Sequence, residues 1–232
     1  ASQQLLDDLY VKSLSKTIWP KTKGYSEFTN QIYNKSNIPL GYRTGYAFLR
    51  DPKYFAITSS RYKFVGKMFE NFDKVLEFGA GDGFKSLIVK SFCKELTLTD
   101  QFEEDKIAFE KNYPFARVKY KKHNFLKKHL KTKYDGIYGL DVLEHINKKN
   151  EGTFLRNITK SLKKNGTLIV GMPSIESQKY GSTNSKKFHI NCKSKKELRK
   201  TLKKFFNNVY MFSMNDEVLH TGFDQMSHYI IG

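Results

Sequence analysis

The sequence predicts an α/β fold, in which a doubly wound, mostly parallel seven-stranded sheet follows a helical N-terminal extension. Three observations support this prediction. Short apolar segments alternate with helical patterns from residue 73 onward, which is typical of a parallel sheet with helices on both faces. A glycine-rich turn separates the first predicted strand from the first predicted helix. The last two strands have no helix between them, which indicates an antiparallel hairpin at the sheet edge.

Apolar periodicity and turn residues place the individual elements. Residues 1–70 are mixed polar and aromatic, with a short amphipathic helix predicted at 61–69, and we take them as an extension that precedes a single domain at 71–232. The predicted strands cover residues 74–78, 95–99, 116–120, 135–140, 167–172, 209–214 and 227–231. The predicted helices cover residues 84–92, 102–112, 142–162 (interrupted near 148–150) and 194–206, with a polar irregular segment at 174–193. The last helix starts with a capping pattern, Ser194 followed by Glu197.

Composition narrows the class of protein. The chain has 232 residues, of which 39% are hydrophobic and 15% aromatic, so a fully disordered chain is not expected. No run of apolar residues is long enough for a transmembrane helix, and the first ten residues lack the pattern of a secretory signal. The two cysteines, Cys93 and Cys192, are far apart, which argues against a disulfide framework or a structural zinc site and favours a reducing, cytoplasmic setting.

The formal net charge of +18 raises the question of an anionic partner. The excess consists of 35 lysines against 6 arginines, whereas dedicated phosphate and base recognition favours arginine. We therefore expect a solvated lysine-rich surface, no membrane binding and no nucleic acid. Binding of an anionic partner, which could be as small as a phosphorylated metabolite, remains an alternative. The sequence does not indicate an oligomeric state.

The most informative local pattern is VLEFGAGDG, residues 75–83. Glycine there permits positive φ and lets a ligand approach the main chain, and in a parallel sheet this turn borders the ligand crevice. The spacing is not the G-x-G-x-x-G of a dinucleotide fold. Two carboxylates flank the turn: Glu77 inside the first strand, where it needs a donor, and Asp100 at the end of the second, where it can accept both hydroxyls of a ribose.

Together these residues resemble the class I S-adenosylmethionine-dependent methyltransferases, of the type that acts on small molecules. EFGAGDG is similar to the first motif of that family, and TLTD, ending at Asp100, to the second. GLDVLEHI (139–146) and NGTLIVGMPS (165–174) resemble the motifs of the fourth and fifth strands. The resemblance runs from Phe72 to Gly232 and implies the strand order 3-2-1-4-5-7-6, with strand seven antiparallel.

The resemblance also implies a cofactor, S-adenosyl-L-methionine, and residues that bind it. Glu77 would order its amino group, Asp100 would bind the ribose, and Gln101 or Phe102 would flank the adenine. Asn124 stands where the family commonly has an acid that faces the adenine amino group. Leu140 would face the transferred methyl group. The complete set of expected cofactor residues is Glu77, Gly79, Ala80, Gly81, Gly83, Asp100, Gln101, Asn124, Phe125 and Leu140.

The candidates for proton transfer follow the fourth and fifth strands. Asp141 and His145 are four residues apart and would share a helix face if a helix began at Asp141, and His189 follows the polar segment that often covers the acceptor in this family. An N-cap role for Asp141 and simple packing for His145 remain the alternatives. Glu144, His220 and His228 are weaker candidates. A metal site built from Asp141, Glu217, His189 or His220 is not predicted, because the ligand spacing is not tight.

The expected function is methyl transfer to a small polar metabolite, such as a sugar or sugar nucleotide, on oxygen or nitrogen. The alternatives are an RNA methyltransferase that uses the basic surface, and a non-catalytic partner that keeps the cofactor fold. The aromatic residues of the N-terminal extension either pack structurally or form a lid over the site. They are Trp19, Tyr25, Tyr42, Tyr46, Phe48 and Tyr54.

Overall fold

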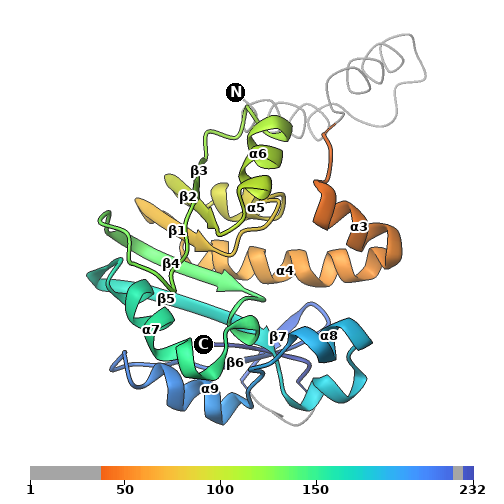
Figure 1. Cartoon of the computed structure of the whole chain (residues 1–232), viewed down its shortest axis with the longest axis vertical. Helices are drawn as coiled ribbons and strands as arrows, with labels where there is room; N and C mark the ends of the chain where they lie inside the picture. Colours follow the sequence, from red (N-terminus) through yellow and green to blue (C-terminus); the bar gives the residue numbers. More distant parts are fainter. Residues whose placement is uncertain (1–37, 222–226) are drawn as a thin grey trace, which may run out of the picture.

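The computed structural model describes residues 38–221 and 227–232, and in these ranges the chain forms an eight-stranded sheet with helices on both faces (Figure 1). The strand order is β3-β2-β1-β4-β5-β8-β6-β7. The parallel strands are β1 (Lys74–Phe78), β2 (Glu95–Asp100), β3 (Lys119–Lys122), β4 (Tyr134–Leu140) and β5 (Leu162–Pro173). Trp19 and Tyr25 of the expected lid lie outside the described residues.

The far side of the sheet is antiparallel, as predicted. β8 (Tyr229–Ile231) lies between β5 and β6 (Phe212–Asn215) and runs antiparallel to both, so β8 is the seventh strand of the predicted order. The predicted order is thereby confirmed. The structure adds an eighth strand, β7 (Val218–His220), which forms a hairpin with β6 inside a segment that the sequence analysis took as a connecting loop.

Alternate residues of the central strands point to opposite faces, and each face has its own apolar core. Val75 belongs to a core covered by α4 (Pro52–Met68), α5 (Ser86–Lys90) and α6 (Glu103–Asn112). Leu76 belongs to the other core, covered by α7 (Lys148–Thr159) and α9 (Lys195–Leu202). Strands buried on both faces are what a parallel sheet requires. None of the described helices combines the length and apolarity needed to cross a bilayer.

Local side chains explain where the helices begin. Asp51 accepts hydrogen bonds from the amides of Lys53 and Tyr54, and Pro52 takes the first helical position, so α4 starts nine residues before the predicted helix at 61–69. The Ser194 and Glu197 capping box at the start of α9 is confirmed. A further helix, α3 (Tyr42–Arg50), precedes α4.

Several predicted segments are wrong in their bounds. The strand predicted at 116–120 is β3, which begins only at Lys119, and the strand predicted at 209–214 is β6, which begins at Phe212. The helix predicted at 84–92 shrinks to the five residues of α5. The helix predicted at 142–162 is not continuous. Asp141 has a left-handed φ of 58°, which is incompatible with an α-helix starting at that residue, and only the short 3-10 helix η1 (Leu143–His145) follows it. The α-helix α7 begins at Lys148, with Asn147 as its N-cap. The segment 174–193 contains η2 (Glu176–Tyr180) and α8 (Thr183–Phe188).

Candidate functional site

The turn after β1 has a backbone that glycine adopts readily and other residues do not. The φ angles are 71° at Gly79 and 56° at Gly81. A Cβ atom on Gly79 would lie 2.3 Å from Val142 Cγ2, so a side chain does not fit there. The amides of Gly79 and Ala80 both donate to the Thr99 carbonyl, at 2.8 and 3.1 Å. These contacts fix the turn at the carboxyl edge of the sheet, with Gly79 and Gly81 half-buried.

Other expected cofactor residues lie under this surface. Ala80 is buried, and so is Gly83, where a Cβ atom would lie 2.4 Å from Phe109 Cδ2. Leu140 is buried at the carboxyl end of β4. These positions shape the floor of the turn and offer a ligand little side-chain surface.

Glu77 is a fully buried carboxylate beside the turn. Its Oε2 accepts a 2.5 Å hydrogen bond from the Tyr138 hydroxyl, while Oε1 has no hydrogen-bond partner among the described residues. Burial raises the pKa of Glu77 to about 7. Glu77 therefore has an unused acceptor atom next to the turn, which suits a nearby cationic or hydrogen-donating group.

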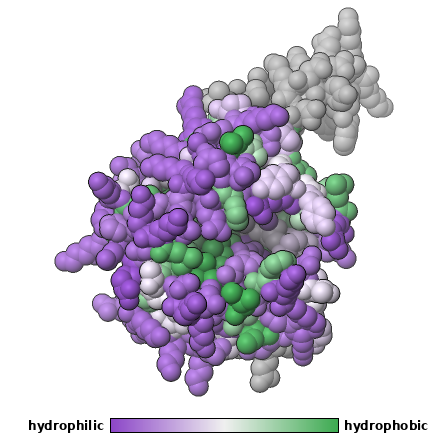
Figure 2. Space-filling model, viewed as in Figure 1, coloured by the Kyte–Doolittle hydropathy of each residue, from purple (hydrophilic) through white to green (hydrophobic). Residues whose placement is uncertain are grey.

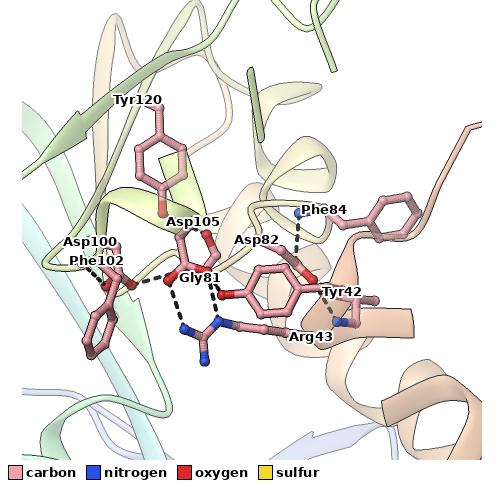
Figure 3. Close-up of polar contacts among 10 residues, drawn as sticks. Tyr42, Arg43, Gly81, Asp82, Phe84, Asp100, Phe102, Asp105 and Tyr120 are labelled. Atoms are coloured by element: carbon pink, nitrogen blue, oxygen red, sulfur yellow. Dashed lines mark hydrogen bonds and ion pairs between the residues drawn. The ribbon is translucent and has the colours of Figure 1, made fainter. Parts of the chain in front are cut away.

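Asp100 is tied to the turn through the main chain. Its Oδ2 accepts from the Gly81 amide at 3.1 Å and its Oδ1 from the Phe102 amide at 3.2 Å. The Tyr120 hydroxyl donates to the Gly81 carbonyl at 2.6 Å (Figure 3). A carboxylate oxygen can accept a second hydrogen bond, so Asp100 keeps capacity for ligand hydroxyls in a fixed position.

Helix α3 lies across the glycine turn, and the sequence analysis did not find the residues that hold it. Arg43 binds the fully buried Asp105 with both Nε and Nη2, at 2.8 and 2.9 Å. Thr44 donates to the buried Asp82 of the turn through its amide and its hydroxyl, at 2.6 and 2.9 Å. Figure 3 shows Arg43 and Asp105 meeting beside Gly81, where a Cβ atom would lie 3.2 Å from Arg43 Cδ.

The predicted adenine side contains three residues with different surroundings. Asn124 Nδ2 donates to Gln101 Oε1 at 3.3 Å, and Asn124 Oδ1 accepts from the Leu126 amide at 2.8 Å. Gln101 is exposed, whereas the Phe125 ring is buried against Phe78 and Phe154. Gln101 and Asn124 thus lie at the surface beside Asp100, and Phe125 contributes to the core below.

Asp141 forms an ion pair that joins β4 to helix α4. Its carboxylate lies 3.0 and 3.3 Å from Arg61 Nη1, and the Arg61 guanidinium stacks 3.7 Å from the centroid of the Tyr229 ring. The Arg61 side chain is only 3% exposed, while Asp141 is 34% exposed. The alternative role of Asp141 as a helix N-cap is wrong, because no helix starts directly after it. Arg61 was not expected as a site residue, because nothing in the sequence marks one buried arginine among 41 basic residues.

Glu144, His145 and His189 come together next to Asp141. The rings of His145 and His189 are 5.0 Å apart, and His145 Nε2 is 3.9 Å from Glu144 Oε1. Burial, and then the charge of Asp141, raises the pKa of Glu144 well above its ordinary value. Burial, together with the neighbouring His145, lowers the pKa of His189, so its imidazole is neutral at pH 7. The helix face that was expected to join Asp141 and His145 does not exist; His145 contacts His189 and Glu144, while Asp141 pairs with Arg61.

The remaining candidates lie apart from this group. His220 is on β7, where its Nε2 lies 2.6 Å from Asn215 Oδ1, and Glu217 is in the turn between β6 and β7. His228 is half-buried next to β8, and burial lowers its pKa. Two of the three predicted catalytic residues, His145 and His189, are thus in direct proximity, while His220 and Glu217 belong to the added hairpin.

The comparison with protein families decides the identity. The model described as "Methyltransferase domain" matches residues 48–209. The chain belongs to this methyltransferase family. The match starts inside α3 and includes the glycine turn, Asp100 and the residues after β4, and it confirms the resemblance to class I S-adenosylmethionine-dependent methyltransferases. The chain is therefore a methyltransferase by family. No curated protein sequence matches it significantly.

Solved structures of other methyltransferases have the same fold. The methyltransferase domain of bacterial CtHen1-C aligns with a TM-score of 0.61 and 16% identity over 75% of this chain and 96% of that chain. N-methyltransferase NodS from Bradyrhizobium japonicum WM9, solved with S-adenosyl-L-homocysteine, aligns with a TM-score of 0.58 and 14% identity over 75% of this chain and 83% of that chain. This chain spans about half of another match, the DhpI-SAM-HEP complex, with 53% of that chain covered.

Proposed function

We propose that this methyltransferase binds S-adenosyl-L-methionine at the glycine turn and methylates a small polar metabolite on oxygen or nitrogen. The observation that carries the proposal is the combination of the open glycine backbone at Gly79 and Gly81 with two carboxylates that keep unused acceptor capacity, Glu77 and Asp100. When bound, the cofactor supplies a methyl group on a positively charged sulfur. A carboxylate that carries an unpaired buried oxygen suits such a cationic ligand.

Different residues around the turn would bind different parts of the cofactor. Glu77 Oε1 would accept a hydrogen bond from an ammonium group, and the Asp100 carboxylate would accept from ribose hydroxyls. Gln101 and Asn124 would flank the adenine at the surface. Helix α3, fixed to Asp82 and Asp105, supports a lid role for the predicted N-terminal extension at residues 1–70, because it already lies across the turn.

The acceptor would lie near the carboxyl ends of β4 and β5. A hydroxyl acceptor needs a group that takes its proton, and the predicted candidates are Asp141, His145 and His189. The lowered pKa of His189 favours the neutral imidazole, which can accept a proton at pH 7. A small acceptor is favoured because the chain past residue 71 contains the sheet and its covering helices with no large inserted recognition segment among the described residues.

Two experiments test this function. Calorimetry with S-adenosyl-L-homocysteine should give one binding site, and Asp100→Ala should weaken it by about tenfold or more, since two charge-assisted hydrogen bonds are lost. Asp73→Ala is the matched control, because Asp73 is an exposed aspartate paired with Lys94. Turnover against pools of polar metabolites, followed by mass spectrometry, should show the gain of one methyl group. Binding that is absent in the unmodified chain would overturn the proposal.

RNA is a second candidate acceptor, and the net charge of +18 is the observation that favours it. Phosphate contacts make affinity fall steeply with salt. If RNA binds, its affinity should therefore drop by orders of magnitude between 50 and 200 mM salt, on the scale expected for several phosphate contacts. A weak affinity with little salt dependence would leave the small metabolite as the acceptor class.

A further inference from the structure

A second group of polar side chains lies beside the acceptor side of the candidate site. Glu144 and His145 come from η1, directly after β4, and His189 follows α8. One ligand atom from each, a carboxylate oxygen or a ring nitrogen, lies within 4.8 Å of the other two. Among the described residues, this is the group of three that could hold a metal ion. Two segments more than 40 residues apart in the chain therefore converge on one small volume.

Glu144 provides an independent indication that something is bound there. The side chain is fully buried, yet neither Oε1 nor Oε2 has a hydrogen-bond partner among the described residues. A carboxyl group buried without any partner is costly and rare in folded proteins. The buried cations Arg61 and Lys193 are paired with other carboxylates, Asp141 and Glu151. A cation between Glu144 and the two imidazoles would satisfy both carboxylate oxygens.

The two histidines are oriented in the way that metal ligands usually are. His145 Nδ1 lies 3.0 Å from the Phe188 carbonyl, and His189 Nδ1 lies 3.1 Å from Gln178 Oε1. Both partners are acceptors, so each Nδ1 carries the proton and donates, which leaves the lone pair on Nε2 in both rings. Hydrogen bonding of the second ring nitrogen is the usual way in which a protein fixes a metal-binding imidazole.

We propose that Glu144, His145 and His189 bind one divalent transition-metal ion. One carboxylate and two imidazoles suit Zn²⁺, Co²⁺, Fe²⁺ or Mn²⁺ better than Mg²⁺, which prefers oxygen ligands and retained waters. Three protein ligands leave coordination positions open for water or for oxygen atoms of an acceptor. Binding of acceptor oxygen atoms by the ion rests on the proposed function. With the Nε2 lone pairs of His145 and His189 both coordinated to the ion, Asp141 is the remaining candidate that could take the proton of the acceptor.

The test titrates Co²⁺ and Zn²⁺ into the full chain after removal of metal with a chelator. Co²⁺ should produce visible absorption bands that saturate at one equivalent, and calorimetry with Zn²⁺ should give the same stoichiometry. Glu144→Gln and His189→Ala should each weaken both ions by about tenfold or more. His129→Ala is the matched control, since His129 is exposed and distant in sequence from the cluster, and it should bind like the unmodified chain.

Several outcomes would overturn the site. These are the absence of saturable Co²⁺ bands in the unmodified chain, an affinity that Glu144→Gln and His189→Ala leave unchanged, or a loss of binding in His129→Ala as well. Circular dichroism of each variant shows whether it is folded, and the Co²⁺ spectrum of the unmodified chain stands even if one variant does not fold. S-adenosyl-L-homocysteine binding is measured separately on the metal-free protein. A chain that binds Zn²⁺ at the cluster but not the nucleoside would refute the proposed function and leave the metal site in place.

Discussion

The two halves of the candidate site are built differently. At the glycine turn, the proposed ligand contacts come from one continuous segment, 77–83, and from Asp100, and the main chain supplies much of the geometry. On the acceptor side, Arg61 of α4, Asp141 and Glu144 after β4, and His189 after α8 come from three separate parts of the chain and act through side chains. The face of the molecule that Figure 2 shows is mostly hydrophilic, with smaller hydrophobic areas between the polar side chains. The first half can therefore be recognised in the sequence as a motif, whereas the residues of the second half become neighbours only in the folded chain.

The largest effect should come from the backbone of the first half. Gly79→Ala should lower the free energy of unfolding by about 2–5 kcal/mol, because the left-handed conformation costs a non-glycine residue about 1–2 kcal/mol and overpacking against Val142 adds about 1–3 kcal/mol. Urea denaturation measures it. Gly152→Ala in α7 is the matched control, since nothing lies within 4 Å of its added Cβ, and it should stabilise slightly. Equal stability of the two variants would contradict the strained turn.

The next effect is a pH dependence that comes from Glu77. Its pKa is about 7 in the folded chain and lies near 4.5 when exposed, so the fold binds a proton that the unfolded chain releases. The stabilising contribution of the neutral carboxyl is complete below the unfolded pKa and is lost as pH rises through about 7, by about 3 kcal/mol in all. Thermal unfolding between pH 4.5 and 8 should show this loss, and Glu77→Gln should flatten it. A slope that persists unchanged in Glu77→Gln would assign it to other groups.

The acceptor half should respond asymmetrically when its buried ion pair is broken. Asp141→Asn leaves the guanidinium of Arg61 buried without its counter-charge and should cost about 2 kcal/mol, which is below the usual figure for a buried pair because Asp141 is partly exposed. Arg61→Met should cost less, since the remaining carboxylate can reach water and the methionine keeps the packing against Tyr229. Chemical denaturation of both variants compares them. If Arg61→Met is the more damaging, packing rather than charge holds this junction.

The smallest effect tests how α3 is attached. Arg43→Met should lower overall stability by only about 1 kcal/mol, because the Arg43 side chain is 49% exposed. It should nevertheless raise hydrogen exchange in residues 42–50, since Tyr42 and Thr44 are then the remaining side chains of α3 that bond to Asp105 and Asp82. Arg50→Met is the control on the same helix, where the exposed arginine contacts only Tyr46 among the partners described for it. Unchanged exchange in Arg43→Met would show that the Asp82 contacts are sufficient.

The same contrast explains what the sequence could predict. The sheet order, the antiparallel β8 and the positions of Gly79, Gly81 and Asp100 follow from local patterns that this fold imposes on contiguous residues. The start of α7 and the environment of Asp141 could not be predicted in this way, because a single left-handed residue and a salt bridge to position 61 override helix periodicity. The roles assigned to the cofactor and catalytic residues, and the boundary at residue 70, stay predictions.

The proposed metal site shows the limit most clearly. The sequence argued against a metal because histidines and acids lacked tight spacing, and 43 residues separate His145 from His189. Tertiary contacts bring the two segments together. The Asn191 amide donates a hydrogen bond to the Glu144 carbonyl, and His145 Nδ1 donates one to the Phe188 carbonyl, so these bonds hold the end of α8 and the segment after it against η1. Ligand spacing along a chain detects only sites made from one segment.

The lysine residues of the edge strand β3 bear on how the sheet edge interacts with other chains. β3 pairs with β2 alone among the described residues, and three of its four residues are lysines, Lys119, Lys121 and Lys122. An open strand edge invites another chain to add a strand, which starts aggregation, and lysines on such an edge oppose that by repulsion and by the cost of dehydration. Replacing them would therefore expose the molecule to fibre-like self-association. Part of the positive charge therefore lies on the strand edge where it opposes the addition of a further strand.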